Sequence, residues 1–250
     1  MPDANTFDWR QFDAYLFDID GTLLNAKGGV HYNSFHTALR DVYGCEGRID
    51  AVTVHGNTDV GILRDTLTYH GQLPLNFEAQ LPAAREIMCD EVELKAEGIE
   101  AQPCPGIYDL LALLRKKGKL LGVVTGNFER IGWCKLGRAG LRSFFSFGSF
   151  SDLHEKREDI FFHGVGLARA IRGSRACICF VGDTPNDIRA AAQLGLPIIA
   201  VATGVHSLAH LQRYSPSVCV SSCAVLLESA ATKGGRIAAP ACENRRQTTD

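Results

Sequence analysis

The feature that most constrains the fold is the alternation of short apolar segments with segments of helical periodicity. Each apolar segment is short enough to be a strand bounded by polar or turn residues. Strands that alternate with helices in this way form a parallel sheet covered by helices on both faces. The sequence therefore predicts an α/β fold with a Rossmann-like, doubly wound parallel sheet. The expected strands are residues 14–17, 120–124, 144–147, 177–181, 198–201 and 218–220.

The stretch of residues 25–102 interrupts this alternation, because it contains no convincing strand. Helical periodicity there predicts three helices, and Thr58 is a candidate N-cap for the second. The three expected helices are residues 33–42, 59–69 and 77–97. We expect a helical cap domain at residues 25–102, inserted into a core domain of residues 1–24 and 103–232, with hinges near residues 25–29 and 102–106. Residues 233–250 lack periodicity and predict a disordered tail.

The composition argues against several classes of function. A formal net charge of -2 gives no electrostatic basis for binding nucleic acid or an anionic membrane surface. No apolar run approaches the roughly 18 residues that span a bilayer, and the N-terminus lacks the layout of a secretory signal. We therefore expect a cytoplasmic protein, whose oligomeric state the sequence does not indicate. The nine cysteines show no C-x-x-C pair and no metal-ligand spacing, which favours buried reduced thiols.

Carboxylates follow two of the expected strands. The run YLFDIDGTLL places Asp18 and Asp20 after the first strand, on the same side of the chain, since alternate residues of a strand share a face. A lone Asp-Gly is common in turns, but the second Asp makes a simple turn the weaker explanation. The run FVGDTPND places Asp183 at another strand end and Asp187 in a first helical turn, where the helix dipole alone could explain Asp187. Four carboxylates offer only oxygen ligands and predict a site for a hard cation such as Mg²⁺.

Anion-binding groups are expected at the same edge of the sheet. Thr125, Gly126 and Asn127 follow a buried-type strand and precede a helix, where N–H groups and a hydroxyl can bind an anion, although a simple turn explains them equally well. Lys156 and Arg157 precede another helix, where such a run is more often a solvated helix start. Together, carboxylates, a hard cation and an anion-binding turn at the carboxyl edge of a parallel sheet predict phosphoryl transfer.

In order and spacing, these motifs resemble the four signature motifs of the haloacid dehalogenase (HAD) superfamily: D-x-D-G-T, a strand ending in Thr-Gly-Asn, a basic residue, and G-D-x-x-x-D. The resemblance runs from about Tyr15 to about Ala202. The insertion is similar to the helical cap of the phosphoglycolate phosphatase and β-phosphoglucomutase branch. Within it, the run HGNTD at residues 55–59, followed by Ile-Leu-Arg at 62–64, resembles a G-x-T-D…I-L pattern of phosphoglycolate-phosphatase-like members.

The resemblance implies a role for each candidate residue. Asp18 would be the nucleophile that forms an aspartyl-phosphate, and Asp20 would protonate the leaving oxygen and then activate water. Mg²⁺ would be held by Asp18, the backbone carbonyl of Asp20, and Asp183, with Asp187 close by. The phosphate-binding residues would be Thr125, Gly126, Asn127 and Arg157, with Lys156 as the alternative to Arg157, because the third motif departs from the commoner Lys-Pro form. Tentative substrate contacts from the cap are His55 and Thr58, although a lone His is more often structural.

The favoured function is therefore Mg²⁺-dependent hydrolysis of a small phosphorylated metabolite, such as a phosphoglycolate-like or sugar phosphate ester. A sugar phosphomutase of the β-phosphoglucomutase type is the second candidate, because it also keeps the residue at Asp20. Haloacid dehalogenases and phosphonatases lack this second carboxylate, which argues against both. A catalytically silent, partner-binding member would have lost a nucleophile or a metal ligand, whereas this chain keeps the full set.

Overall fold

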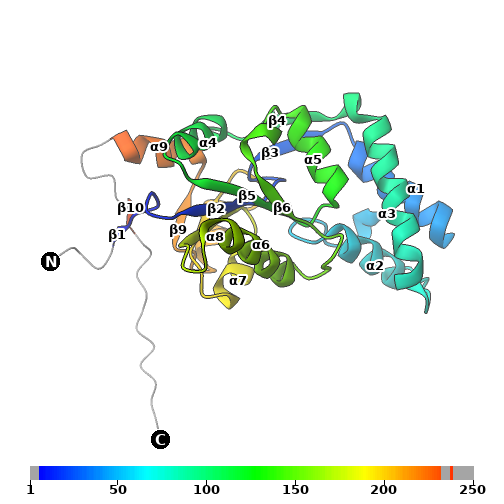
Figure 1. Cartoon of the computed structure of the whole chain (residues 1–250). Coiled ribbons are helices and arrows are strands. Elements are labelled where there is room, and N and C mark those ends of the chain that lie inside the picture. The colour runs from blue at the N-terminus through cyan, green and yellow to red at the C-terminus, as the bar shows by residue number, and fades with distance from the viewer. Residues whose placement is uncertain (1–5, 232–236, 239–250) are drawn as a thin grey trace, which may run out of the picture.

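The computed structural model describes residues 6–231 and 237–238, and its centre is a six-stranded sheet (Figure 1). The strand order is β6-β5-β2-β7-β8-β9, and every neighbouring pair is parallel. From the central β2, the chain fills one half of the sheet and then crosses to the other, so a topological switch point lies at β2. The expected doubly wound α/β fold is confirmed. The strands are β2 (Ala14–Phe17), β5 (Leu120–Val124), β6 (Phe147–Ser149), β7 (Ile178–Gly182), β8 (Ile198–Val201) and β9 (Val218–Val220).

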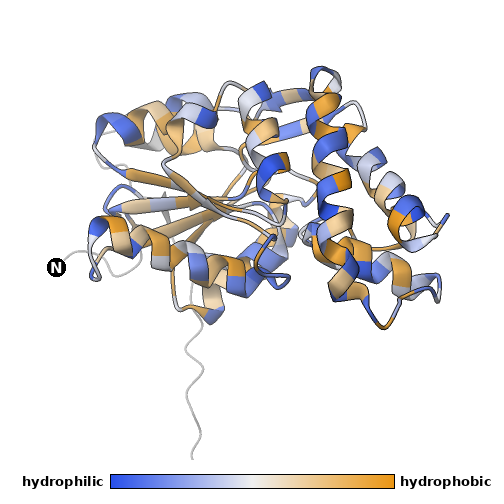
Figure 2. Cartoon of the chain, turned by 45° about the vertical axis from the view of Figure 1, so that its right-hand side comes forward, coloured by the Kyte–Doolittle hydropathy of each residue, from blue (hydrophilic) through white to orange (hydrophobic). Residues whose placement is uncertain are grey.

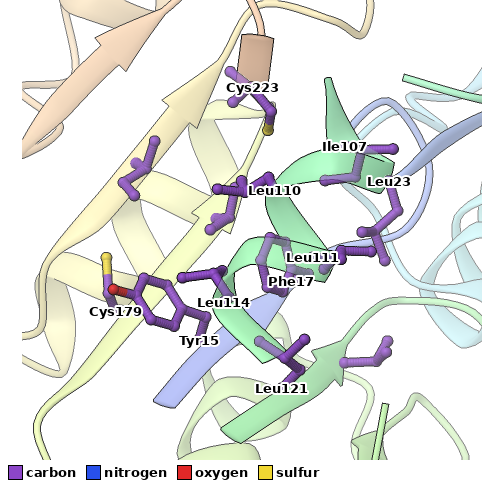
Figure 3. Packing of buried hydrophobic residues seen from close by; sticks show 14 of the residues in the cluster. Tyr15, Phe17, Leu23, Ile107, Leu110, Leu111, Leu114, Leu121, Cys179 and Cys223 are labelled. Carbon is purple, nitrogen blue, oxygen red and sulfur yellow. The ribbon is translucent and has the colours of Figure 1, made fainter. Parts of the chain in front are cut away.

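Helices cover both faces of this sheet, and its strands are largely hydrophobic (Figure 2). Hydrophobic strands of this kind are expected in a sheet that is buried on both faces. In β2, Tyr15 and Phe17 join the buried cluster on one face, and Ala14 and Leu16 join the cluster on the other. The first face is covered by α4 (Ile107–Lys116), α5 (Glu129–Arg138) and α9 (Cys223–Ala231), and the second by α6 (Arg157–Arg172), α7 (Pro185–Gln193) and α8 (Leu208–Gln212). Figure 3 shows the packing of β2 against the apolar stripe of α4.

The inserted helices lie at the end of the molecule away from β1 (Thr6–Phe7) and β10 (Ile237–Ala238) (Figure 1). They are α1 (Val30–Tyr43), α2 (Asp59–Tyr69) and α3 (Phe77–Leu94), and they bury a hydrophobic cluster that also includes Phe128 and Ile131 outside the insertion. Helix α2 begins where the sequence predicts, because the Thr58 side chain accepts a hydrogen bond from the Gly61 N–H (3.0 Å). Helix α3 ends three residues before the expected position, since a short 3-10 turn, Ala96–Gly98, follows it.

Two strands inside this region depart from the sequence-based expectation. Leu24–Lys27 (β3) and Glu100–Pro103 (β4) pair antiparallel where the chain leaves and re-enters the core. Both segments are only four residues long, LNAK and EAQP. Polar and apolar residues alternate in each, but neither contains a β-branched or aromatic residue and most of their side chains are exposed, so the pairing depends on a long-range contact that local propensity does not encode. Strand β6 also begins at Phe147 instead of residue 144, because residues 142–144 form a 3-10 turn.

The described ends of the chain meet in a second small sheet, in which β1 (Thr6–Phe7) pairs antiparallel with β10 (Ile237–Ala238). The expectation of a disordered tail at residues 233–250 falls, apart from this pair, outside the described residues. Among the helices that the structure describes, none combines the length and apolar character needed to cross a membrane.

Candidate active site

Three buried carboxylates meet at the carboxyl edge of the central sheet. Asp18 directly follows β2, Asp183 directly follows β7, and Asp187 lies in the first turn of α7. Because β2 and β7 are parallel neighbours, their ends lie side by side, and one oxygen of each carboxylate lies within 4.8 Å of the others. Gly21 makes the turn after β2 possible: its φ is +82°, and a Cβ there would lie 2.2 Å from an oxygen of Asp183.

Arg157 is the cation that contacts this group. Its Nε donates a hydrogen bond to Asp187 (2.7 Å), and its Nη2 lies 2.9 Å from an oxygen of Asp18. Arg157 is buried at the start of α6, whereas the preceding residue, Lys156, is exposed. The structure therefore brings Arg157, the favoured residue, to the site, and not the alternative, Lys156.

Asp187 has two functions in this geometry. Its Oδ2 accepts hydrogen bonds from the backbone N–H (3.0 Å) and the hydroxyl (2.7 Å) of Thr184, which completes a capping box at the start of α7. Its other oxygen accepts from Arg157. The helix-start explanation and the site explanation for Asp187 thus both hold.

The inner carboxylates carry more negative charge than Arg157 can balance. Burial raises the pKa of Asp18 to about 7; Arg157 opposes this shift, and the carboxylates of Asp187 and Asp20 add to it. Burial, with the charges of Asp18 and Asp187, also raises the pKa of Asp183 well above its ordinary value. If all three carboxyl groups are ionised beside one guanidinium, two negative charges stay uncompensated. Oxygen-only donors with this excess charge fit a hard divalent cation.

Asp20 lies in a different environment beside this group. Its carboxylate accepts hydrogen bonds from Lys135 Nζ at both oxygens (2.9 and 2.7 Å) and from Asn127 Nδ2 (2.8 Å). The Asp20 side chain is 43% exposed toward the cavity, but the protein around it still desolvates the carboxylate, which would raise its pKa. The Lys135 ammonium and these hydrogen bonds outweigh this, so the pKa lies below its ordinary value. The Asp20 side chain does not belong to the carboxylate cluster that could hold a metal ion.

Lys135 is a cation of the site that the sequence does not single out. It lies on the buried face of α5, one helical turn after Ile131. A lysine at an apolar position of a helix that follows the Thr-Gly-Asn turn was the available signal, because a charge there must find a partner when the helix packs.

The turn after β5 lies within the same site. Thr125 and Asn127 are both buried, and the Thr125 hydroxyl accepts a hydrogen bond from Asn127 Nδ2 (2.8 Å). The Asn127 amide is thus shared among Thr125, Asp20 and Lys135. Gly126 lies against the inserted helices, since a Cβ there would come within 2.4 Å of the Asn57 carbonyl oxygen.

Helix α2 docks on this turn through its first residues. The Asp59 N–H donates to the Gly126 carbonyl (2.7 Å), and the Phe128 N–H donates to the Asp59 carboxylate (2.8 Å). The Thr58 hydroxyl donates to the carbonyl of Glu155 (2.8 Å), next to the third motif. The start of α2 therefore contacts both the expected anion-binding turn and the loop before α6.

A cavity of about 300 Å³ lies between the carboxylates and the inserted helices. It reaches all three strand-end motifs, and its other wall carries apolar and basic side chains of the insertion. His55 lines this cavity; Thr58 does not, and its hydroxyl is already used for capping and for the Glu155 contact. Its polar and charged lining residues include Asp18, Asp20, Lys27, His31, His55, Thr125, Asn127, Lys135, Arg157 and Asp183, together with Gly126.

This chain is similar in sequence and in structure to known proteins. The sequence model of a haloacid dehalogenase-like hydrolase matches residues 12–195. A probable phosphatase, IndB of Dickeya dadantii, is 29% identical over 83% of this chain and 88% of its own length. A phosphoglycolate phosphatase of Agrobacterium fabrum is 27% identical over 76% of this chain and 80% of its own length. The crystal structure of a predicted phosphoglycolate phosphatase from Haemophilus somnus superposes with a TM-score of 0.65 at 21% identity, covering 89% of this chain and all of that one.

Proposed function

We propose a specific reaction for this chain, which belongs to the haloacid dehalogenase-like hydrolase family: the Mg²⁺-dependent hydrolysis of a small phosphate monoester through an aspartyl-phosphate. The observation that carries the proposal is the group of Asp18, Asp183 and Asp187 around one guanidinium, at the edge of a cavity. The phosphatase names of the relatives support the same class of enzyme.

In this proposal, Asp18 attacks phosphorus. A bond forms between its carboxylate oxygen and phosphorus while the bond from phosphorus to the ester oxygen breaks. Arg157, which contacts Asp18, and the Thr125 hydroxyl with the Gly126 N–H and the Asn127 amide, bind the phosphoryl oxygens. The Asn127 amide also has to stay with Asp20, so we assign it the smaller share of this binding.

Asp20 is proposed as the general acid and base. It gives a proton to the leaving oxygen in the first step and takes one from the attacking water in the second, which releases phosphate and restores Asp18. The structure holds Asp20 as a carboxylate paired with Lys135, the form that the second step needs. Protonating Asp20 for the first step has to loosen that pairing, so we expect the first step to favour leaving groups that need little protonation.

The proposed ligands of Mg²⁺ are the carboxylates of Asp18 and Asp183 and the backbone carbonyl of Asp20, with Asp187 close by. A bound Mg²⁺ supplies the charge that balances the two uncompensated negative charges and the phosphoryl oxygens. The three buried carboxylates, which offer only oxygen donors within 4.8 Å of one another, support this assignment.

Residues 25–102 are proposed to form a cap on a core of residues 1–24 and 103–232. A hydrophobic cluster formed mostly by side chains of this stretch, with Phe128 and Ile131 as its members from the core, supports this division. His55, which lines the cavity, is proposed to contact the part of the substrate beyond the phosphate. The cavity volume and the names of the relatives favour a small phosphorylated metabolite of the phosphoglycolate or sugar-phosphate kind.

The test is release of phosphate by the purified chain. With p-nitrophenyl phosphate and Mg²⁺ we expect turnover that EDTA abolishes and added Mg²⁺ restores. A panel of phosphorylated metabolites, with phosphoglycolate and hexose phosphates included, then identifies the ester with the highest kcat/KM. Full turnover after exhaustive chelation, or no turnover of any ester with Mg²⁺ present, would overturn the proposed function.

A further inference from the structure

Lys135 is a buried lysine whose charge faces the proposed general acid–base residue. The Lys135 side chain is 4% exposed, whereas that of its partner, Asp20, is 43% exposed. Its Nζ donates to both oxygens of Asp20 and to Asn127 Oδ1 (2.7 Å), which uses every N–H of the ammonium. The lysine therefore enters the core from α5 with its charge fully paired at the wall of the cavity.

Stability alone is a poor explanation for this arrangement. Desolvating an ammonium costs several kcal/mol, and replacing a buried ion pair by apolar groups is often neutral or stabilising. Asp20 does not need Lys135 to avoid an unpaired buried charge, because its carboxylate is open to the cavity and water can solvate it. A cation placed here instead changes where the carboxylate lies.

The hydrogen bonds form a closed triangle that fixes Asp20. Lys135 contacts Asp20 and Asn127, and Asn127 Nδ2 donates back to Asp20 (2.8 Å). Asn127 Nδ2 also donates to the hydroxyl of Thr125 (2.8 Å). A carboxylate held at both oxygens cannot rotate about its last bond without losing a charge-assisted hydrogen bond. The triangle therefore ties the orientation of Asp20 to the turn proposed to bind phosphate.

We propose that Lys135 is a positioning residue that holds the Asp20 carboxylate, through Asn127, in register with the phosphate-binding turn. This inference rests on the proposed function. It assigns the two cations of the site different partners: Arg157 contacts Asp18 and Asp187, and Lys135 contacts Asp20. Lys135 acts through Asp20 and not on the phosphoryl group.

A double-mutant cycle tests the proposal. Lys135→Met keeps the length of the side chain and removes the donor, and a misplaced reacting group typically costs about 10²-fold in rate. We expect kcat for p-nitrophenyl phosphate to fall by about 10²-fold in the wild-type background, with KM nearly unchanged. In the Asp20→Asn background, the same change should have almost no effect, because the group that Lys135 positions is already gone.

Three controls accompany the cycle. Arg138→Met removes an exposed cation from the last turn of the same helix and should leave kcat unchanged. Lys135→Gln keeps a donor without the charge and should retain more activity than Lys135→Met. Binding of inorganic phosphate, measured by calorimetry in the presence of Mg²⁺, should be nearly equal in wild type and Lys135→Met, since Arg157 and the turn remain.

The outcomes separate this inference from the proposed function. An inactive wild type overturns the proposed function. An active wild type with an equally active Lys135→Met overturns the positioning role alone. Equal fold losses in the wild-type and Asp20→Asn backgrounds, or a parallel loss of phosphate binding, show a structural role for Lys135 and also overturn it. If Lys135→Met does not fold, the same cycle with Lys135→Gln decides.

Discussion

The site has an inner half, around Asp18, and an outer half, around Asp20, and the charge of the carboxylates is balanced differently in the two. In the inner half, Asp18, Asp183 and Asp187 share the single guanidinium of Arg157, and burial raises the pKa of Asp18 to about 7. In the outer half, Asp20 has Lys135 to itself, and its pKa lies below the ordinary value, since the paired charge outweighs burial. The ratio of carboxylates to cations thus separates two aspartates only two residues apart. The inner half needs a further cation, and the outer half does not.

The largest expected losses of activity come from Asp18→Asn in the inner half and Asp20→Asn in the outer half. Asp18→Asn removes the proposed attacking oxygen, so turnover should fall to background for every ester. Asp20→Asn leaves Asp18 in place and removes proton transfer, which is typically worth about 10²–10⁴-fold. Steady-state kinetics with p-nitrophenyl phosphate and with a sugar phosphate measures both. The loss in Asp20→Asn should be smaller for the nitrophenyl ester, whose phenolate leaves without a proton.

Trapping of the intermediate sharpens this contrast. In Asp20→Asn, hydrolysis of the aspartyl-phosphate should become limiting, so acid quenching during turnover should find phosphate on Asp18. Asp18→Asn should give none. Equal losses for both variants on every ester, without a trapped phosphoenzyme, would contradict the proposed division between the two aspartates.

Changes to the carboxylates of the inner half should weaken the binding of Mg²⁺. Asp183→Ala is expected to raise the Mg²⁺ concentration for half-maximal activity by more than about tenfold. Removing a residue that only hydrogen-bonds to a metal ligand already costs about tenfold or more in metal affinity, and Asp183 is proposed to be a ligand itself. Ca²⁺ should inhibit, because it takes more ligands at longer distances and would misplace Asp18. Titration of activity with each metal measures both effects. An unchanged Mg²⁺ titration in Asp183→Ala would remove this residue from the ligand set.

The pH dependence of stability tests the inner half of the site without a measurement of turnover. A carboxyl group whose folded pKa is raised keeps its proton in the folded state while the unfolded chain has lost it. In EDTA, the free energy of unfolding should therefore fall as pH rises from about 4 to about 7, by on the order of a few kcal/mol. Mg²⁺ should oppose this fall. Urea unfolding at several pH values measures it, and an identical slope in Asp18→Asn would show that Asp18 is not its source.

The smallest effect is expected in the inserted region. His55→Ala should change the ratio of kcat/KM between two natural esters by several-fold, since one lost contact typically alters discrimination by about tenfold, and should leave p-nitrophenyl phosphate nearly unaffected. His70→Ala is the matched control, because His70 is exposed at the far end of α2 and does not line the cavity. Equal losses for all esters in His55→Ala would indicate a folding defect instead of substrate contact.

The sequence predicts the strand-end carboxylates well and the contacts between distant segments poorly. Asp18 and Asp183 could be placed because each directly follows a buried strand, and parallel strands end at one edge. The choice of Arg157 over Lys156 could not be made locally, because it depends on which residue of a helix start faces the sheet. Thr58 has one contact of each kind. Its capping contact with Gly61 lies within one helical turn and could be predicted, whereas its hydrogen bond to Glu155 joins distant segments and could not.

The β3–β4 ribbon sets how the inserted region can move relative to the core. Its two crossings are hydrogen-bonded in register, from Leu24 opposite Pro103 to Lys27 opposite Glu100, and the Cys104 N–H extends the ladder to the Leu23 carbonyl (3.0 Å). Neither strand can slide without breaking that ladder. We therefore expect the two crossings to move together as one pair in any motion of the inserted region. In such a motion, we expect Lys27, on the ribbon itself, to move less than Arg64, whose ion pair with Glu155 would have to break.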